Sequence, residues 1–142
     1  MKLQRSVQTT AAPAVVFAYL SDFTTTNEWD PGTVRTERVS GDGGVGTMYS
    51  NTSSFMGRET ALSYEVVEYR PDSLFALRGE NATVVANDTM EIAPAGEGSR
   101  VTYTADFEFK GFGKLVAPLL KRPLKKLGDE AESGLRDALA KL

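Results

Sequence analysis

The chain of 142 residues contains neither cysteine nor histidine. Without cysteine it has no disulfide, no thiolate nucleophile and no thiolate metal ligand, and without histidine it lacks the commonest general base and the commonest metal ligand. These two absences exclude thiol and imidazole chemistry of every kind. We therefore expect no metal site and no other cofactor in this protein.

Long apolar runs are also missing. No segment approaches the length of a membrane-spanning helix, and residues 1–10 are too polar for a signal peptide, which predicts a cytoplasmic protein. Sixteen basic and 19 acidic residues give a net charge of −3, so most of the surface would repel a phosphate backbone and we expect no nucleic-acid partner. With 41% hydrophobic and 25% charged residues, the composition fits a single globular domain over residues 1–142.

The middle of the chain, residues 33–110, is predicted to form about six strands separated by turn sequences. In the last of these strands, apolar residues from Val101 to Phe109 alternate with polar ones, so one face is covered and the other meets water. Residues 41–46 match the letters of the dinucleotide-binding fingerprint, but no helical pattern follows them, which favours a hairpin turn. The same alternation places further side chains on the covered face: Leu62, Tyr64, Val66, Phe75, Leu77, Met90 and Ile92.

Two short helices are predicted between a polar N-terminal strand and this region. The first has an apolar stripe within residues 16–23, with Pro13 in its first turn and Thr9 or Thr10 as its cap. The second follows residues 24–28, whose polar side chains can cap it, and Pro31 ends it because proline cannot donate a backbone hydrogen bond.

From Phe112 to the C-terminus, apolar residues recur at steps of three and four, which predicts one long helix. Pro118 is expected in its first turn and Pro123 at a kink or a second start. Leu119 and Leu127 are expected in its buried stripe. The opposite face carries a basic cluster of Lys121, Arg122, Lys125 and Lys126. This cluster is either a solvated surface or a site of transient contact with an anionic membrane.

Several segments together resemble a known family. They are the run from Val7 to Pro13 continuing into Val16-Phe17, then Leu20-Ser21-Asp22-Phe23, Trp29-Asp30-Pro31 and Gly46-Thr47-Met48-Tyr49. This pattern resembles the polyketide cyclase/dehydrase branch of the START and Bet v 1-like superfamily, often called SRPBCC. The resemblance implies an α+β helix-grip fold: a curved antiparallel sheet of about seven strands, two short helices after strand 1, and one long C-terminal helix over the concave face. It is a poor guide to activity, because the superfamily includes lipid carriers, hormone receptors and cyclases.

Three functions stay open at this point. The favoured one is binding or transport of a hydrophobic small molecule of lipid, polyketide or isoprenoid type, in a cavity between the sheet and the C-terminal helix. The second is a polyketide cyclase or dehydratase that acts in the same cavity without histidine or metal. The third is a protein-interaction module in which the basic helix or an exposed tip at Phe55 and Met56 docks on a partner. Both a monomer and a homodimer are compatible with the sequence.

Trp29 is the first candidate for the ligand site, because it is the only indole and large aromatic side chains with one polar atom often lie at pocket rims. If the protein is an enzyme, proton transfer would fall to Tyr64, Tyr103, Arg58 or Glu28. Arg58 shares the alternation of the covered face, so its side chain could point inward. The residues expected to line the ligand site are Trp29, Phe55, Met56, Tyr64, Phe75, Leu77, Met90, Tyr103, Phe107, Leu115 and Leu119.

Overall fold

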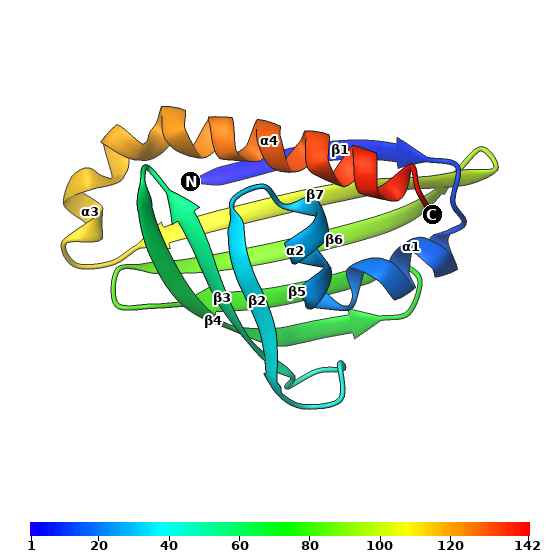
Figure 1. The fold of residues 1–142 in the computed structure, drawn as a ribbon, viewed down its shortest axis with the longest axis horizontal. Helices are drawn as coiled ribbons and strands as arrows, with labels where there is room; N and C mark the ends of the chain where they lie inside the picture. The colour runs from blue at the N-terminus through cyan, green and yellow to red at the C-terminus, as the bar shows by residue number, and fades with distance from the viewer.

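A computed structural model describes all 142 residues, and its main element is a seven-stranded antiparallel sheet (Figure 1). The spatial order is β1-β7-β6-β5-β4-β3-β2. Each strand from β2 to β6 therefore pairs with the strand that follows it along the chain, and β7 also pairs with β1. The predicted strand region and its hairpin turns are confirmed. The strands are β1 (Lys2–Thr9), β2 (Thr33–Ser40), β3 (Met48–Phe55), β4 (Arg58–Arg70), β5 (Leu74–Glu80), β6 (Val84–Ala95) and β7 (Gly98–Phe109).

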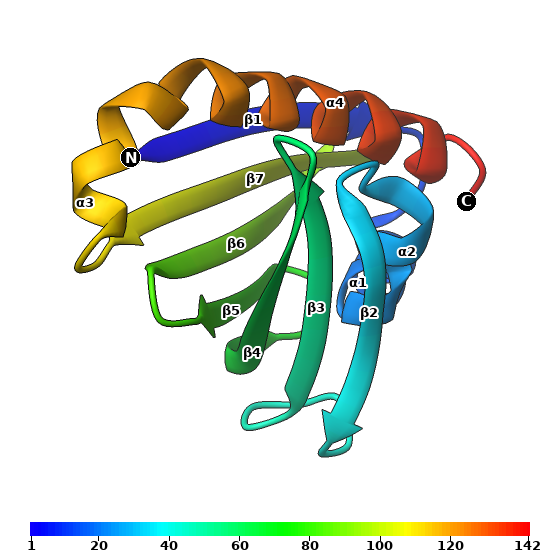
Figure 2. The same ribbon diagram turned by 60° about the vertical axis from the view of Figure 1, so that its left-hand side comes forward.

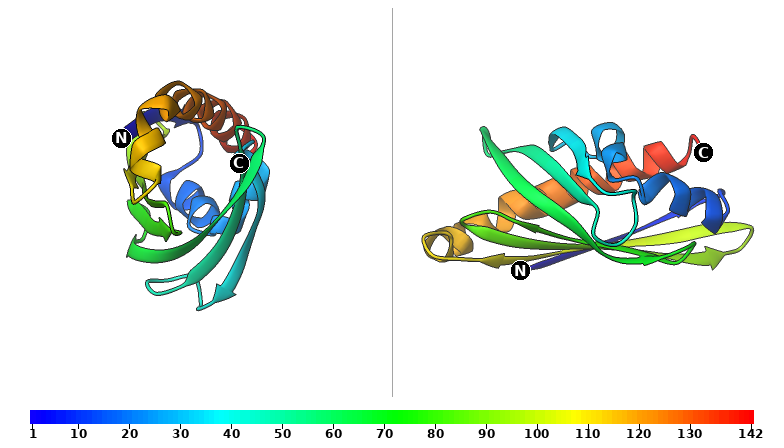
Figure 3. Two further views of the ribbon diagram at one scale, coloured as in Figure 1. Left: turned by 90° about the vertical axis from the view of Figure 1, so that its left-hand side faces the viewer. Right: turned by 90° about the horizontal axis from the view of Figure 1, so that it is seen from below.

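The sheet is strongly curved (Figures 2 and 3). The hydrophobic core joins side chains of the sheet to side chains of the helices. The pairing register shifts between Val66 and Glu68 in β4, and two further shifts occur between β2 and β3. An extra residue at such a bulge bends the strand and increases its twist. Beyond the bulge, the ring of Tyr69 lies 5.1 Å from that of Phe17, so this end of β4 also packs against a helix.

Two short helices follow β1, as predicted. Helix α1 (Pro13–Leu20) begins with Pro13, and α2 (Thr26–Trp29) follows a 3-10 turn over Phe23–Thr25. The expected threonine cap of α1 is wrong, because Ala12 occupies the N-cap and makes no side-chain bond. The hydroxyl of Thr9 instead donates a hydrogen bond to the carbonyl oxygen of Leu139 at 3.1 Å, which ties β1 to the end of the last helix.

The C-terminal segment is not one helix from Phe112. It comprises α3 (Gly113–Val116), a 3-10 segment over Ala117–Leu120, and α4 (Lys121–Leu139). Pro118 lies in the first turn of the 3-10 segment and Pro123 in the first turn of α4, positions that tolerate the missing backbone N–H. The second helix start expected at Pro123 is thus confirmed. Helix α4 runs along β1 and contacts α2, while α3 lies at the far end of the molecule from the C-terminus (Figure 1).

The break in the helix changes which leucines are buried. Leu135 and Leu139 are each 1% exposed, whereas Leu115 and Leu119 are 74% exposed. The expectation that Leu119 lies in the buried stripe is therefore wrong. The helical register restarts at Lys121, so residues before it do not continue the stripe that faces the sheet.

Helix α4 approaches α2 very closely at Gly134. A Cβ at this position would collide with the carbonyl oxygen of Trp29, so a side chain there would force the two helices apart. Trp29 and Leu135 belong to the same core cluster, together with α1 residues such as Val16 and core residues of the sheet such as Phe75. Gly134 therefore helps to set the height of α4 above the sheet.

Candidate functional site

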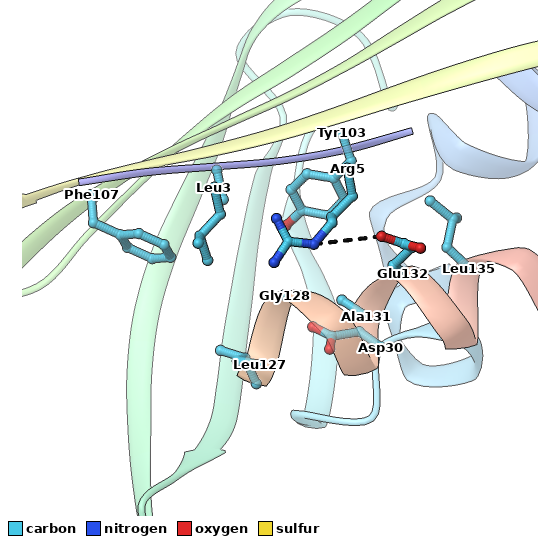
Figure 4. A pocket seen from close by; sticks show the side chains of 11 residues that line it. Leu3, Arg5, Asp30, Tyr103, Phe107, Leu127, Gly128, Ala131, Glu132 and Leu135 are labelled. Carbon is cyan, nitrogen blue, oxygen red and sulfur yellow. Dashed lines mark ion pairs between the residues drawn. The ribbon is translucent and has the colours of Figure 1, made fainter. Parts of the chain in front are cut away.

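Two adjacent chambers lie between the concave face of the sheet, the end of α2 and helix α4. The sheet chamber has a volume of about 150 Å³ and is bordered mainly by β3, β4, β6 and β7. The helix chamber has a volume of about 60 Å³ and lies between β1, β7 and α4 (Figure 4). Four residues line both chambers and form the partition between them: Asp30, Tyr103, Phe107 and Leu127.

The helix chamber is mostly apolar and contains one arginine, Arg5 of β1. Its guanidinium reaches α4, where Nε lies 3.5 Å from Oε1 of Glu132 (Figure 4). Nη2 of Arg5 also lies 2.8 Å from Oδ1 of Asp129. Two carboxylates thus balance the charge of Arg5. The arginine ties α4 to the first strand, and its charge is already matched within the protein.

The sheet chamber contains a buried acid, Asp88 of β6, which is only 5% exposed. The hydroxyl of Tyr103, on the neighbouring strand β7, donates a hydrogen bond to Oδ2 of Asp88 at 3.1 Å. Burial raises the pKa of Asp88 from 3.8 to about 7; the Tyr103 hydrogen bond opposes this shift, and the negative charge of Asp30 adds to it. Near neutral pH, Asp88 therefore exists in both protonation states, which is the property required of a proton donor or acceptor.

Asp30, the residue after α2, is the second acid of this site. Its Oδ1 accepts a hydrogen bond from the backbone N–H of Gly32 and its Oδ2 accepts one from the hydroxyl of Thr33, both at 3.0 Å. Burial raises the pKa of Asp30 above its usual value, although these hydrogen bonds oppose the shift. No lysine or arginine lines the sheet chamber, although Asp30 also lines the helix chamber, where Arg5 is paired with carboxylates of α4.

Tyr64 of β4 supplies a free hydroxyl to the sheet chamber. The residue is 7% exposed and lines the chamber, yet its hydroxyl makes no hydrogen bond. Burial and the nearby carboxyls of Asp88 and Asp30 raise the pKa of Tyr64 well above its ordinary value, and the same causes act on Tyr103. Both tyrosines therefore remain O–H donors at any physiological pH.

Trp29 packs against the ring of Tyr103, one of the polar residues of the site. Its ring meets that of Tyr103 edge-on, with centroids 5.7 Å apart and an interplanar angle of 82°. The residue is 2% exposed, and its indole Nε1–H has no acceptor. Trp29 is not among the residues that line either chamber, so it supports the site through Tyr103.

The wall of the sheet chamber nearest β2 and β3 is polar and fully paired. The hydroxyls of Thr26 and Thr36 are hydrogen bonded at 2.7 Å, and Nδ2 of Asn51 donates to Oγ1 of Thr36 at 2.8 Å. Ser53 donates its hydroxyl proton to Oδ1 of Asn51 at 2.8 Å. This network fixes α2 against the sheet, whereas the hydroxyl of Tyr64 and Oδ1 of Asp88 remain free to hydrogen bond with a ligand.

The predicted site residues fall into three groups. Phe55, Tyr64, Tyr103 and Phe107 line the sheet chamber, whereas Trp29, Phe75, Leu77 and Met90 pack in the core. The remaining predicted residues, Met56, Leu115 and Leu119, are exposed.

Two of the proton-transfer candidates lie away from the chambers. Arg58 has the inward alternation that the sequence suggested, but it lies at the tip of the β3–β4 hairpin, where it is exposed and lines neither chamber. The prediction of an inward Arg58 is therefore wrong. Glu28 is also exposed, and its Oε1 accepts a hydrogen bond from the hydroxyl of Tyr19 at 2.9 Å.

Sequence reasoning missed Asp88, the most perturbed acid of the site. The signal was present, because Asp88 precedes Met90 and Ile92 at steps of two and so belongs to the same covered face. A carboxyl on an otherwise apolar strand face is seldom buried without a function or a partner.

No group of three or more acidic side chains converges in a way that could hold a metal ion.

The sheet order, the two short helices after β1 and the long C-terminal helix together make the helix-grip arrangement of START and Bet v 1-like proteins. The sequence matches the family described as polyketide cyclase/dehydrase and lipid transport over residues 1–140. The chain therefore belongs to this family. A search of curated proteins gave no match.

Solved structures with the same fold share little sequence with this chain. The Zhui aromatase/cyclase from a Streptomyces species has a TM-score of 0.83 at 12% identity, covering 98% of this chain and 93% of its own. A protein from Thermus thermophilus has a TM-score of 0.82 at 19% identity, covering 98% and 97%. A START superfamily protein from Mycobacterium smegmatis has a TM-score of 0.73 at 14% identity, covering 96% and 98%. At these identities the likeness concerns the fold alone.

Proposed function

We propose that this protein binds a hydrophobic small molecule between the sheet and α4. The observation that carries the proposal is the sheet chamber itself, in which a mostly apolar lining contains the unpaired hydroxyl of Tyr64 and the carboxyl of Asp88. Ligand pockets typically combine a mostly apolar lining with a few polar groups that orient the ligand. The family description, which includes lipid transport, supports the same function.

The chamber must enlarge when a ligand enters. Its volume of about 150 Å³ is smaller than the roughly 300–1,000 Å³ of most ligand pockets. Phe55 and Leu127 line both the sheet chamber and a surface groove between the β3–β4 hairpin and the start of α4. These two side chains separate the chamber from the groove, so their displacement would join the two spaces and open a route for the ligand.

A pair of substitutions on β6 tests whether the ligand binds in the sheet chamber. Ala86 is 1% exposed and lines the sheet chamber, whereas Ala93 of the same strand is exposed. We expect Ala86→Leu to fill the chamber and to abolish retention of a small molecule, measured by native mass spectrometry of protein purified from its own host. The Ala93→Leu variant should retain the small molecule as the wild-type protein does. Equal retention by both variants would place the ligand elsewhere, and no retained or titratable ligand in wild type would remove the proposal.

A second candidate function, catalysis of a cyclase or dehydratase type, is favoured by Asp88. A carboxyl with a pKa of about 7 beside a tyrosine O–H can move protons near neutral pH, which is the chemistry such reactions require. The family description and the fold shared with an aromatase/cyclase are consistent with this alternative. Binding and catalysis would use the same chamber.

We further propose that α3 and the start of α4 contact an anionic membrane when the ligand is exchanged. Phe112, at the N-cap of α3, Leu115 in α3 and Leu119 in the 3-10 segment are 73%, 74% and 74% exposed. Lys114 and the basic cluster of Lys121, Arg122, Lys125 and Lys126 lie in the same segment and are exposed. Exposed apolar side chains beside lysines suit the surface of an anionic bilayer. None of the helices combines the length and apolar character needed to cross a membrane.

A further inference from the structure

We infer that the sheet chamber selects ligands whose polar head carries no negative charge, such as an alcohol, a ketone or an amine, and rejects carboxylates such as fatty acids. This inference rests on the proposed binding function and names the class of ligand. It follows from the juxtaposition of Asp30, Asp88 and the unpaired hydroxyl of Tyr64 around one chamber.

The charges around the chamber disfavour an anion. Asp88 is faced by Tyr103 from β7, by Tyr64 from β4 and by Asp30 from the end of α2, and none of these groups is cationic. Arg5, in the helix chamber, is already paired with two carboxylates of α4. A ligand carboxylate inside the sheet chamber would therefore lie beside two acids with no cation in the chamber lining, which is strongly unfavourable. The basic residues Arg122 and Lys126 line the groove outside Phe55 and Leu127.

The hydrogen-bonding groups of the chamber suit an uncharged head. Tyr64 has an O–H without an acceptor, and only Oδ2 of Asp88 is occupied, by the hydroxyl of Tyr103. A ligand alcohol can accept from Tyr64 and donate to Oδ1 of Asp88, and a ketone can accept from Tyr64. A carboxylate can only accept, so it cannot use the free oxygen of an ionised Asp88.

The test compares compounds with one hydrocarbon chain and different heads. Binding of 1-decanol, decylamine and decanoate to the wild-type protein is measured at pH 8 by native mass spectrometry and by the fluorescence of Trp29. We expect decanoate to bind at least roughly tenfold more weakly than 1-decanol, a difference of about 1.4 kcal/mol. Equal or tighter binding of decanoate would overturn the inference while leaving the proposed function intact. Failure of all three compounds, and of a broader apolar panel, would overturn the proposed function itself.

A charge-removing variant assigns the selectivity to Asp88. Asp88→Asn should reduce the preference for 1-decanol over decanoate by several-fold, because it removes one buried negative charge. Glu91→Gln, which removes a charge from an exposed position on the same strand, should leave the preference unchanged. An unchanged preference in folded Asp88→Asn would contradict the role of this residue. If the variant does not fold, Asp30→Asn gives the same comparison, because its amide oxygen can still accept one of the two hydrogen bonds that Asp30 accepts.

Discussion

The hydroxyl of Tyr103 donates a hydrogen bond to Asp88 across two adjacent strands, β7 and β6, inside a chamber with no basic side chain. The bond stabilises the ionised form of Asp88, yet burial outweighs it and holds the pKa near 7. Asp88 is thus less stable as an anion in the folded protein than in the unfolded chain. This difference links the stability of the protein to pH.

Stability should fall as the pH rises from about 4 to about 7. Over this range the unfolded chain has already ionised Asp88, whose ordinary pKa is 3.8, while the folded protein still binds the proton. Raising the pH then favours the unfolded state by at most about 1.4 kcal/mol for each pH unit. The measurement is the free energy of unfolding of wild type and Asp88→Asn over this range. The advantage of the variant should grow with pH and level off above about pH 7, and a constant difference would contradict the raised pKa.

If the protein is an enzyme, its rate should change with pH around 7, rising if Asp88 acts as a base and falling if it acts as an acid. Asp88→Asn and Tyr103→Phe should each lose most of the turnover of a polyketide-like diketone while remaining folded. Glu28→Gln, altered at an exposed acid outside the chambers, is the matched control. Normal turnover in both chamber variants would remove the pair from the mechanism.

Leu135→Ala should destabilise the domain by roughly 2–5 kcal/mol, the usual range for a leucine removed from a packed core. Leu119→Ala should change the free energy of unfolding very little, because the Leu119 side chain is 74% exposed. Denaturant unfolding of the two variants measures the contrast directly. A large loss in Leu119→Ala would show that the 3-10 segment packs differently from the structure described above.

Gly134→Ala should destabilise the protein, although alanine favours a helix interior by about 1 kcal/mol over glycine. The added Cβ would collide with the carbonyl oxygen of Trp29 and lift α4 from α2. Ser133→Ala, at the exposed neighbouring position, should be neutral or slightly stabilising. Thermal unfolding distinguishes these outcomes, and a stabilising Gly134→Ala would disprove the close approach.

Removing the exposed apolar surface should weaken binding to anionic liposomes. We expect Leu115→Ser combined with Leu119→Ser to lose most cosedimentation at low salt, and wild-type binding to decrease as salt increases. Val39→Ser combined with Val45→Ser is the control, because these valines are 66% and 65% exposed on β2 and the turn after it. Equal losses in both double variants, or no wild-type binding, would contradict the membrane proposal.

The fold could be predicted from local patterns because each element has its own signal. Alternation along β7 and proline at the first turn of α1 each depend on a few neighbouring residues. The site depends on contacts that no local pattern contains. The partners of Asp88 come from other elements, and the exposure of Leu119 follows from where α4 begins. Arg58 had the correct alternation, but alternation cannot tell that a side chain at the tip of a hairpin stays exposed.

The break at residues 117–120 divides the C-terminal segment into parts that can open separately. Helix α4 is anchored by buried leucines and by the contacts of Arg5, whereas Leu115 and Leu119 bury little surface. Segments with few buried contacts open at a lower free energy than the global unfolding of the protein. The backbone amides of residues 113–120 should therefore exchange with solvent much faster than those of residues 131–139. The end of the molecule beside α3 can thus loosen while the core around Leu135 and Leu139 stays folded.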